Sequence, residues 1–387
     1  MICDFAHPDF GQEEKDAVNR VLSGSWLAAG PENEAFEAEF AQYVGSKYAV
    51  CVNSGSSGNL LALASLSLPR GSRVLTSACG FPATLAPILH LGLEPVLVDY
   101  DLTTLNISID AILQAVHDVP DIQTILLAHT LGNPVDVTRL ERLQLMGIAL
   151  IEDCCEAAGT RLGSKSVGTF GRLGTFSFYP SHQITALGGG GMVVTDDPVL
   201  ARRMRSLRDW GKLVQDGYKQ GEVLTTYEGG YYPGYTYETV GFNFKLPDAN
   251  AAFGREQLKR LNEFSAQRQA HYRLLWESLE DDDVPWLLPS PLPAQPHVSW
   301  FGYPLVLREG SRDAFGTYLE AAGIRHRPFF AGNILRHPPY QYLGNPGDFP
   351  VADYLMKHAC FVGVWQGLTT DHLDYMVETI RAWTPTT

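Results

Sequence analysis

Short apolar runs alternate with stretches of helical spacing through the first half of the chain. The apolar runs are continuous, which predicts buried strands of a parallel sheet covered on both faces. We expect such strands at residues 48–52, 73–76, 95–98, 124–128 and 148–151. Helical spacing before and between them predicts helices at residues 11–23, 31–44 and 59–68. This alternation predicts an α/β fold with a mostly parallel central sheet sandwiched by helices.

The pattern changes near residue 212. Residues 212–240 are rich in glycine and tyrosine, which we interpret as a long surface excursion. The rest of the chain predicts a long helix at 248–279, strands near 299–307 and 323–327, and helices near 311–322 and 370–383. We therefore expect a large domain at residues 12–250 and a smaller α/β C-terminal domain at 251–387, which residues 1–11 join.

Composition narrows the possible partners. The formal net charge is −14, and an acidic surface disfavours nucleic acid and anionic membranes. No apolar stretch approaches the roughly 20 residues of a membrane span, and no leader of signal type opens the chain. The six cysteines form no Cys-x-x-Cys pair, so we expect reduced thiols, no metal site and a cytoplasmic location.

A glycine- and serine-rich turn, residues 53–59, connects the first predicted strand to a helix. Gly55 permits close approach of the backbone to a ligand. The Ser56 hydroxyl and the free N–H groups of a helix N-terminus suit a phosphate. An ordinary turn has the same composition, so both interpretations stay open here.

Two further residues suit a flat, polar ligand. Asp153 comes at the end of a buried strand, where a carboxylate can face a ligand crevice. Phe81 lies in the segment 78–84 and can stack on a planar ring. A helix N-cap is the alternative for Asp153, and a core side chain is the alternative for Phe81.

His182 is the most informative candidate. It follows the run Phe178-Tyr179-Pro180-Ser181 and precedes four consecutive glycines, residues 188–191. A neutral imidazole titrates near physiological pH and can move protons, and glycines allow unusual dihedral angles beside a ligand. A lone histidine is more often a surface or structural residue, so only its context supports a functional role.

Together these motifs resemble the DegT/DnrJ/EryC1/StrS family of sugar aminotransferases, over essentially the whole chain. Most of that family carries a lysine in the place of His182, and its amine bonds covalently to the aldehyde of pyridoxal phosphate. An imidazole cannot do so. The chain is most similar to a subgroup that carries histidine there, the 3-dehydratases of nucleotide-linked 4-keto-6-deoxyhexoses. The segments that carry this resemblance are residues 79–82, 128–133, 152–155, 178–180, 208–211, 330–333 and 367–370.

The resemblance implies a pyridoxal phosphate enzyme of fold type I with specific cofactor contacts. Asp153 is expected to pair with the pyridine nitrogen, Glu156 to lie near the ring hydroxyl and Phe81 to stack on the ring. The residues expected to hold the phosphate are Gly55, Ser56 and Ser177. Asn243 would reach the phosphate of the partner subunit's cofactor, which implies a homodimer with shared active sites.

Histidine in place of lysine implies dehydration at C3 of the sugar, with pyridoxamine phosphate as the working cofactor and His182 as acid and base. L-Glutamate is the expected donor that regenerates the amine form, unless a reductase acts on the product. The iron–sulfur members of the subgroup have clustered cysteines after the segment that matches residues 208–211. Here no cysteine occurs from 156 to 359, so we predict no iron–sulfur cluster.

Two other functions stay open. A sugar aminotransferase needs a cofactor lysine, and Lys212 is the nearest loop candidate. A catalytically inactive member of the family with a binding role would need no such group. The glycine run adds a further departure, since the family usually has an acidic residue within it.

Overall fold

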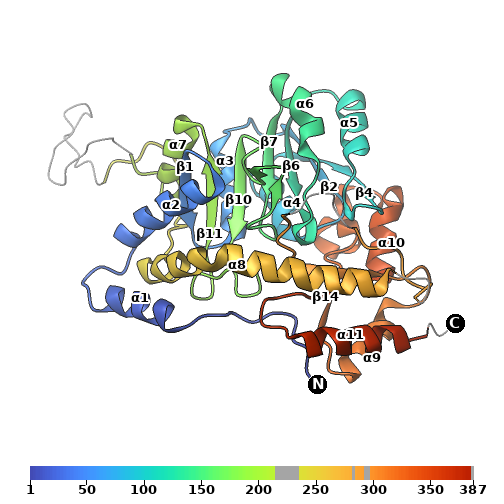
Figure 1. Ribbon diagram of the computed structural model, residues 1–387. Helices are drawn as coiled ribbons and strands as arrows, with labels where there is room; N and C mark the ends of the chain where they lie inside the picture. The colour runs from blue at the N-terminus through green and yellow to red at the C-terminus, as the bar shows by residue number, and fades with distance from the viewer. Residues whose placement is uncertain (214–234, 281–283, 292–296, 385–387) are drawn as a thin grey trace.

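A seven-stranded sheet forms the centre of the protein (Figure 1). The computed structural model describes residues 1–213, 235–280, 284–291 and 297–384. Six strands run parallel, and β11 is antiparallel to both of its neighbours. In spatial order the strands are β1 (Tyr48–Val52), β11 (Gly191–Thr195), β10 (Leu173–Ser177), β7 (Ala149–Asp153), β6 (Ile122–Ala128), β2 (Arg73–Ser77) and β3 (Glu94–Val98).

Helices cover both faces of this sheet, as the continuous apolar strands predict. On one face Phe40 of α2 packs with Phe176 of β10 and Phe264 of α8. On the other face Leu61 of α3 packs with Val193 of β11. The helices of this region are α1 (Gln12–Leu22), α2 (Pro31–Val44), α3 (Gly55–Ser65), α4 (Pro82–His90), α5 (Ile109–Asp118), α6 (Glu141–Leu145) and α7 (Pro198–Arg208).

A smaller antiparallel sheet forms the C-terminal part. Its strand order is β12 (Gly302–Val306), β14 (Ala359–Gly363) and β13 (His326–Pro328). Its helices are α9 (Arg312–Ala321), α10 (Pro350–His358) and α11 (Thr370–Ala382). The N-terminal segment joins this part, because Cys3 forms a bridge with Ile324 (Figure 1).

The long helix α8 (Asp248–Leu279) links the two parts. It packs on α1 and α2 at its start and on β12 and α11 farther along (Figure 1). The boundary expected between residues 250 and 251 therefore falls in the first turn of a continuous helix. Since one helix contributes to both cores, the two parts hold each other in a defined orientation.

The sequence pattern missed some strands. We did not predict β10, β11 or β14, and β11 is the antiparallel member of the large sheet. Helix α3 begins at Gly55, earlier than the predicted residue 59, because Ser54 caps it by accepting a hydrogen bond from the backbone N–H of Ser57. Two short hairpins, β4 (Tyr100–Asp101) with β5 (Asn106–Ile107) and β8 (Arg161–Leu162) with β9 (Lys165–Ser166), complete the strands.

Most of the predicted glycine- and tyrosine-rich excursion, residues 214–234, lies outside the described residues. Among the helices of the described ranges, none is both long and apolar enough to cross a bilayer.

Candidate active site

A cavity of about 470 Å³ opens where several strands of the large sheet end. Asp153 ends β7, Ser177 ends β10 and Ala128 ends β6, and all three line the cavity. The N-terminus of α3 and the loop after β10 form further walls. Ligands of α/β proteins bind at this edge of the sheet, because strand ends and helix N-termini converge there. Phe301, Arg327 and Phe330 close the cavity from the C-terminal part.

Asp153 lies on the cavity wall with its carboxylate held by three donors. Asn59 donates to Oδ2 at 2.7 Å and Thr84 donates to the same oxygen at 2.8 Å. The backbone N–H of Cys155 donates to Oδ1 at 3.1 Å. These three donors fix the orientation of the carboxylate, which can pair with a protonated ring nitrogen.

The first turn of α3 and the end of β10 meet at one side of the cavity. Ser54, Gly55 and Ser56 line it together with Ser177. Helix N-termini carry unpaired N–H groups and a positive dipole end, and serine hydroxyls add donors, so this corner suits an anion. A Cβ on Gly55 would lie 2.7 Å from Sγ of Cys155 and 2.7 Å from Cβ of Ser177, so only glycine fits there without displacement.

Gly55→Ala should therefore destabilise the protein by about 1–3 kcal/mol through overpacking, and it should weaken binding of a phosphate at this corner. Urea unfolding and titration with pyridoxal phosphate measure the two effects. Gly58→Ala is the matched control in the same helix, because its Cβ would meet neighbours no nearer than 3.6 Å. Alanine there should be neutral or stabilising, given its higher helix propensity. Equal behaviour of the two variants would contradict the packing argument.

Glu156 lies in the cavity wall and accepts a hydrogen bond from the backbone N–H of Leu131 at 2.6 Å. Burial raises the pKa of this carboxyl to about 8, against the lowering effect of the Leu131 hydrogen bond, and the nearby Asp153 charge raises it further. The protonated form can donate a hydrogen bond to a ligand oxygen, and the expected place of Glu156 near a ring hydroxyl stays a prediction.

This pKa shift makes a prediction for stability. The folded state keeps the Glu156 proton up to about pH 8, whereas the unfolded chain loses it near the ordinary value of 4.5. The free energy of unfolding of the cofactor-free protein should therefore decrease as the pH rises from about 5 to about 8. The free energy of unfolding of Glu156→Gln should depend less on pH. That of Glu309→Gln, a change at an exposed position, should depend on pH as in the wild type. Urea unfolding at several pH values checks this, and parallel curves for wild type and Glu156→Gln would refute it.

His182 lies on the loop after β10 and faces the cavity. Its Nδ1 is 3.4 Å from the carbonyl oxygen of Ser177, and its ring makes an edge contact with Phe301 at a centroid distance of 5.3 Å. Burial lowers the pKa of His182 to about 4, although the Ser177 carbonyl opposes this shift. The imidazole is therefore neutral at physiological pH.

The other predicted residues divide between cavity and surface. Phe81 lies at the cavity with 56% of its surface exposed, so it is not the core side chain that we kept as an alternative. Asn243 is exposed and does not line the cavity of this subunit, so its expected contact with a partner's cofactor stays a prediction. Among the described residues that line the cavity, none is lysine, and Lys212 lies near Asp209 instead.

Sequence reasoning missed the side chains that support Asp153. Asn59 and Thr84 come from α3 and α4, and nothing in their local sequence indicates that both reach one carboxylate. The segment that forms β13 adds an arginine to the cavity wall. Arg327 lines the cavity, whereas Arg325 forms an ion pair with Glu320.

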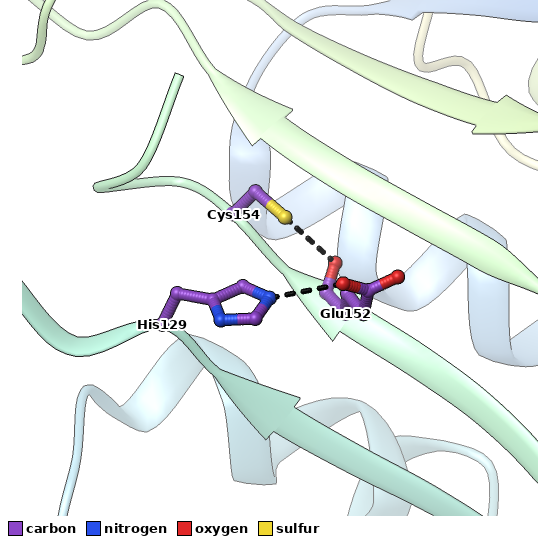
Figure 2. Close-up of side chains that lie close together, drawn as sticks. All are labelled: His129, Glu152 and Cys154. Carbon is purple, nitrogen blue, oxygen red and sulfur yellow. Dashed lines mark hydrogen bonds and ion pairs between the residues drawn. The ribbon is translucent and has the colours of Figure 1, made fainter. Parts of the chain in front are cut away.

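A buried cluster of His129, Glu152 and Cys154 lies beside the cavity (Figure 2). Its residue types suit a metal, but Glu152 already accepts hydrogen bonds from His129 at 3.0 Å and from the backbone N–H groups of Gly168, Phe170 and Gly171. The other ring nitrogen of His129 accepts from the backbone N–H of Val135. These bonds use the available lone pairs, so we interpret the cluster as a structural tie between β7 and the 168–171 loop.

All six cysteines are free, and the two adjacent ones occupy different environments. Cys154 packs in the core with Phe176, whereas Cys155 lines the cavity. Burial raises the pKa of both thiols, which disfavours the thiolate form that a cluster requires. The prediction of no iron–sulfur cluster can be tested by iron analysis of the purified protein.

The site combines a serine-rich helix N-terminus, a hydrogen-bonded carboxylate and an exposed aromatic ring. These groups fit a planar, phosphorylated pyridine, and the sheet with its C-terminal α/β part has the aminotransferase-like architecture of pyridoxal phosphate enzymes. The family model described as "DegT/DnrJ/EryC1/StrS aminotransferase family" matches residues 8–381. The chain belongs to this family.

Individual relatives are similar over nearly the whole chain. The dTDP-4-dehydro-2,6-dideoxy-D-glucose 3-dehydratase of Saccharopolyspora spinosa is 39% identical, over 95% of this chain and 84% of that protein. The lipopolysaccharide biosynthesis protein RfbH of Salmonella typhimurium is 37% identical, over 95% of this chain and 88% of that protein. The GDP-4-keto-6-deoxy-D-mannose 3-dehydratase of Escherichia coli O55:H7 is 31% identical, over 95% and 96%.

Solved structures agree with this relationship. A mutant of GDP-4-keto-6-deoxymannose-3-dehydratase (ColD) with bound GDP-perosamine superimposes with a TM-score of 0.89 at 29% identity, covering 98% of this chain and 100% of that chain. The same enzyme with a trapped PLP-glutamate geminal diamine gives a TM-score of 0.88, with the same identity and coverage. The predicted resemblance to the 3-dehydratase subgroup is confirmed.

Proposed function

We propose that this protein removes the C3 hydroxyl of a nucleotide-linked 4-keto-6-deoxyhexose, with pyridoxamine phosphate as its cofactor. The observation that carries the proposal is a histidine in the cavity, with no lysine among the described residues that line it. Relatives named as 3-dehydratases of such sugars support the reaction class.

The residues of the cavity have separate binding roles in this proposal. The first turn of α3 and Ser177 hold the phosphate, Asp153 holds the ring nitrogen in its protonated form, and Phe81 covers one ring face. When bound, the cofactor supplies an amine for the sugar ketone and a ring that accepts electrons. Arg327 lies on the wall formed by the C-terminal part, where it suits the phosphates of a nucleotide sugar.

His182 is the proton-transfer group. Its low pKa leaves it neutral, and an Nδ1–H that donates to the Ser177 carbonyl leaves the Nε2 lone pair free to accept a proton. The imidazole would remove a proton on the cofactor side and, once protonated, deliver one to the departing hydroxyl. Histidine commonly contributes about 10²–10⁴-fold in such general acid–base steps.

The wider assignments follow from the same proposal. A homodimer would bring Asn243 of one subunit to the cofactor phosphate of the other. L-Glutamate would restore the amine form, as the glutamate adduct trapped in the related ColD enzyme suggests. If glutamate is inactive, a reductase that acts on the product is the alternative.

Purified protein with pyridoxamine phosphate and a panel of 4-keto-6-deoxy sugar nucleotides tests the proposal. Mass spectrometry with and without L-glutamate should detect loss of the C3 hydroxyl, and glutamate should sustain more than one turnover. Borohydride reduction followed by peptide mapping should label no lysine. A labelled lysine with amino-sugar product would favour an aminotransferase, and failure to bind pyridoxamine phosphate would favour an inactive protein.

A further inference from the structure

Arg268 is a fully enclosed cation behind the loop that carries His182. It lies in α8 and is only 1% exposed. Its guanidinium donates to the carbonyl oxygen of His182 at 3.2 Å, to the carbonyl oxygen of Trp300 at 3.2 Å and to Oε1 of Gln366 at 3.2 Å. All three acceptors are neutral, so no contact cancels the charge.

This arrangement is unusual for a buried charge. Within the described ranges no carboxylate lies within ion-pair distance of Arg268, although most other arginines of the protein pair with one. Burial lowers the pKa of the guanidinium to about 9, which still leaves it charged at neutral pH. An unpaired charge costs free energy in the interior, and a neutral donor would avoid that cost.

We propose that Arg268 is a positioning residue for His182, which anchors the catalytic loop by its carbonyl and adds a positive charge to the burial that already keeps the imidazole neutral. This inference rests on the proposed role of His182. The electrostatic role explains why this residue is charged. A neutral donor could anchor the carbonyl equally well, but it could not disfavour protonation of the ring.

The loop geometry supports the anchoring role. The backbone N–H of His182 donates to the carbonyl oxygen of Tyr179 at 2.9 Å, and its carbonyl accepts from Arg268. The next residue is also held, since the Gln183 amide donates to the carbonyl oxygen of Ser299 at 2.9 Å. The carbonyl of His182 is thus tied to α8, and the side chain of the next residue is tied to the segment before β12.

The surrounding charges define the electrostatic role. From the strand ends, Asp153 favours the protonated imidazole, whereas Arg268 on α8 opposes it. The other titratable side chains that line the same cavity are Tyr100, His129, Cys155, Glu156, Tyr179 and Arg327. On α8, His271 lies close enough to Arg268 to be affected by its charge. The charge of Arg268 therefore offsets the effect of the Asp153 carboxylate on the imidazole.

Gln366→Glu tests the electrostatic role without removing the arginine. Glutamate has nearly the same shape and places a carboxylate where Oε1 already accepts from Arg268. The new charge should cancel the field of the guanidinium and raise the pKa of His182 by about one unit. In cofactor-free protein labelled with ¹³C at histidine Cε1, a pH titration should show His182 protonating at higher pH than in wild type. The His182→Asn spectrum assigns the signal, and Gln366→Met is the uncharged control, expected to leave the titration in place.

Arg268→Lys and Arg268→Met test the anchoring role in the loaded enzyme. Both should lower kcat with little change in KM, and lysine should restore part of the loss because it keeps a charged donor. Identical His182 titrations in wild type and Gln366→Glu would overturn the inference, whether or not the enzyme dehydrates sugars. Absence of dehydration in the wild type would instead refute the proposed function and leave the titration result standing.

Discussion

His182→Asn should lower the rate of C3 dehydration by at least about 100-fold, while the affinity for pyridoxamine phosphate stays within about threefold of wild type. Asparagine can still donate to the Ser177 carbonyl, so the loop should keep its conformation, but an amide cannot exchange a proton near neutral pH. The cofactor contacts that we assign to Asp153 and the α3 N-terminus do not involve the imidazole. Mass spectrometry of product and a cofactor titration separate the two effects.

The matched control for this variant is His117→Asn. His117 is exposed at the end of α5, so its replacement should leave both readouts unchanged. Full dehydration by His182→Asn would refute the proton-transfer role. Loss of cofactor binding in that variant would instead indicate that the histidine supports the site structurally.

Asp153→Asn should have an effect of similar size but a different signature, because it should impair cofactor binding as well as turnover. A carboxylate and a pyridinium a few ångströms apart attract by roughly 4 kcal/mol at an effective dielectric constant of about 20, which corresponds to about 10³-fold. The amide also fits its surroundings poorly. Asn59 and Thr84 both donate to Oδ2, so an amide nitrogen in that place would face a donor.

Thr84→Val tests the hydrogen-bond support of Asp153 separately from its charge. It keeps the charge of Asp153 and removes one of its three hydrogen bonds, which is worth about 1.5–3 kcal/mol for a charged acceptor. We expect a loss of about 10- to 100-fold, smaller than that of Asp153→Asn. Cofactor affinity and kcat measured on both variants check the order. An Asp153→Asn enzyme that binds and turns over like wild type would exclude the pairing with the ring nitrogen.

Much of the site was predictable because its residues follow local rules. Asp153 ends an apolar strand, and Gly55 and Ser56 open a helix after another strand, so both are expected at the same edge of a parallel sheet. His182 was found through its neighbours in the sequence, since Phe178-Tyr179-Pro180 just before it carries part of the resemblance to the family. The strand β10, which carries that segment to the cavity, was itself not predicted.

The unpredicted features depend on contacts between distant segments. Asn59 and Asp153 lie far apart in the chain and meet because α3 packs on β7 and β10. In the sequence, Arg268 is one more polar residue of a long amphipathic helix. Its burial behind His182 depends on how α8 crosses the sheet. No periodicity reveals such a charge, since periodicity describes one helix face and not what covers it.

The order of residues alone predicted the α/β class, the residues at the strand ends that line the cavity and His182 as a candidate on the loop after them. These depend on short-range patterns, in which neighbours along the chain decide conformation and residue chemistry. Only the folded structure determines which side chains share the cavity. It also determines that Glu156 keeps its proton and that His182 is unprotonated. Those properties arise from burial and from charges brought together across the fold, and the free energy of a buried charge is set by its surroundings in space.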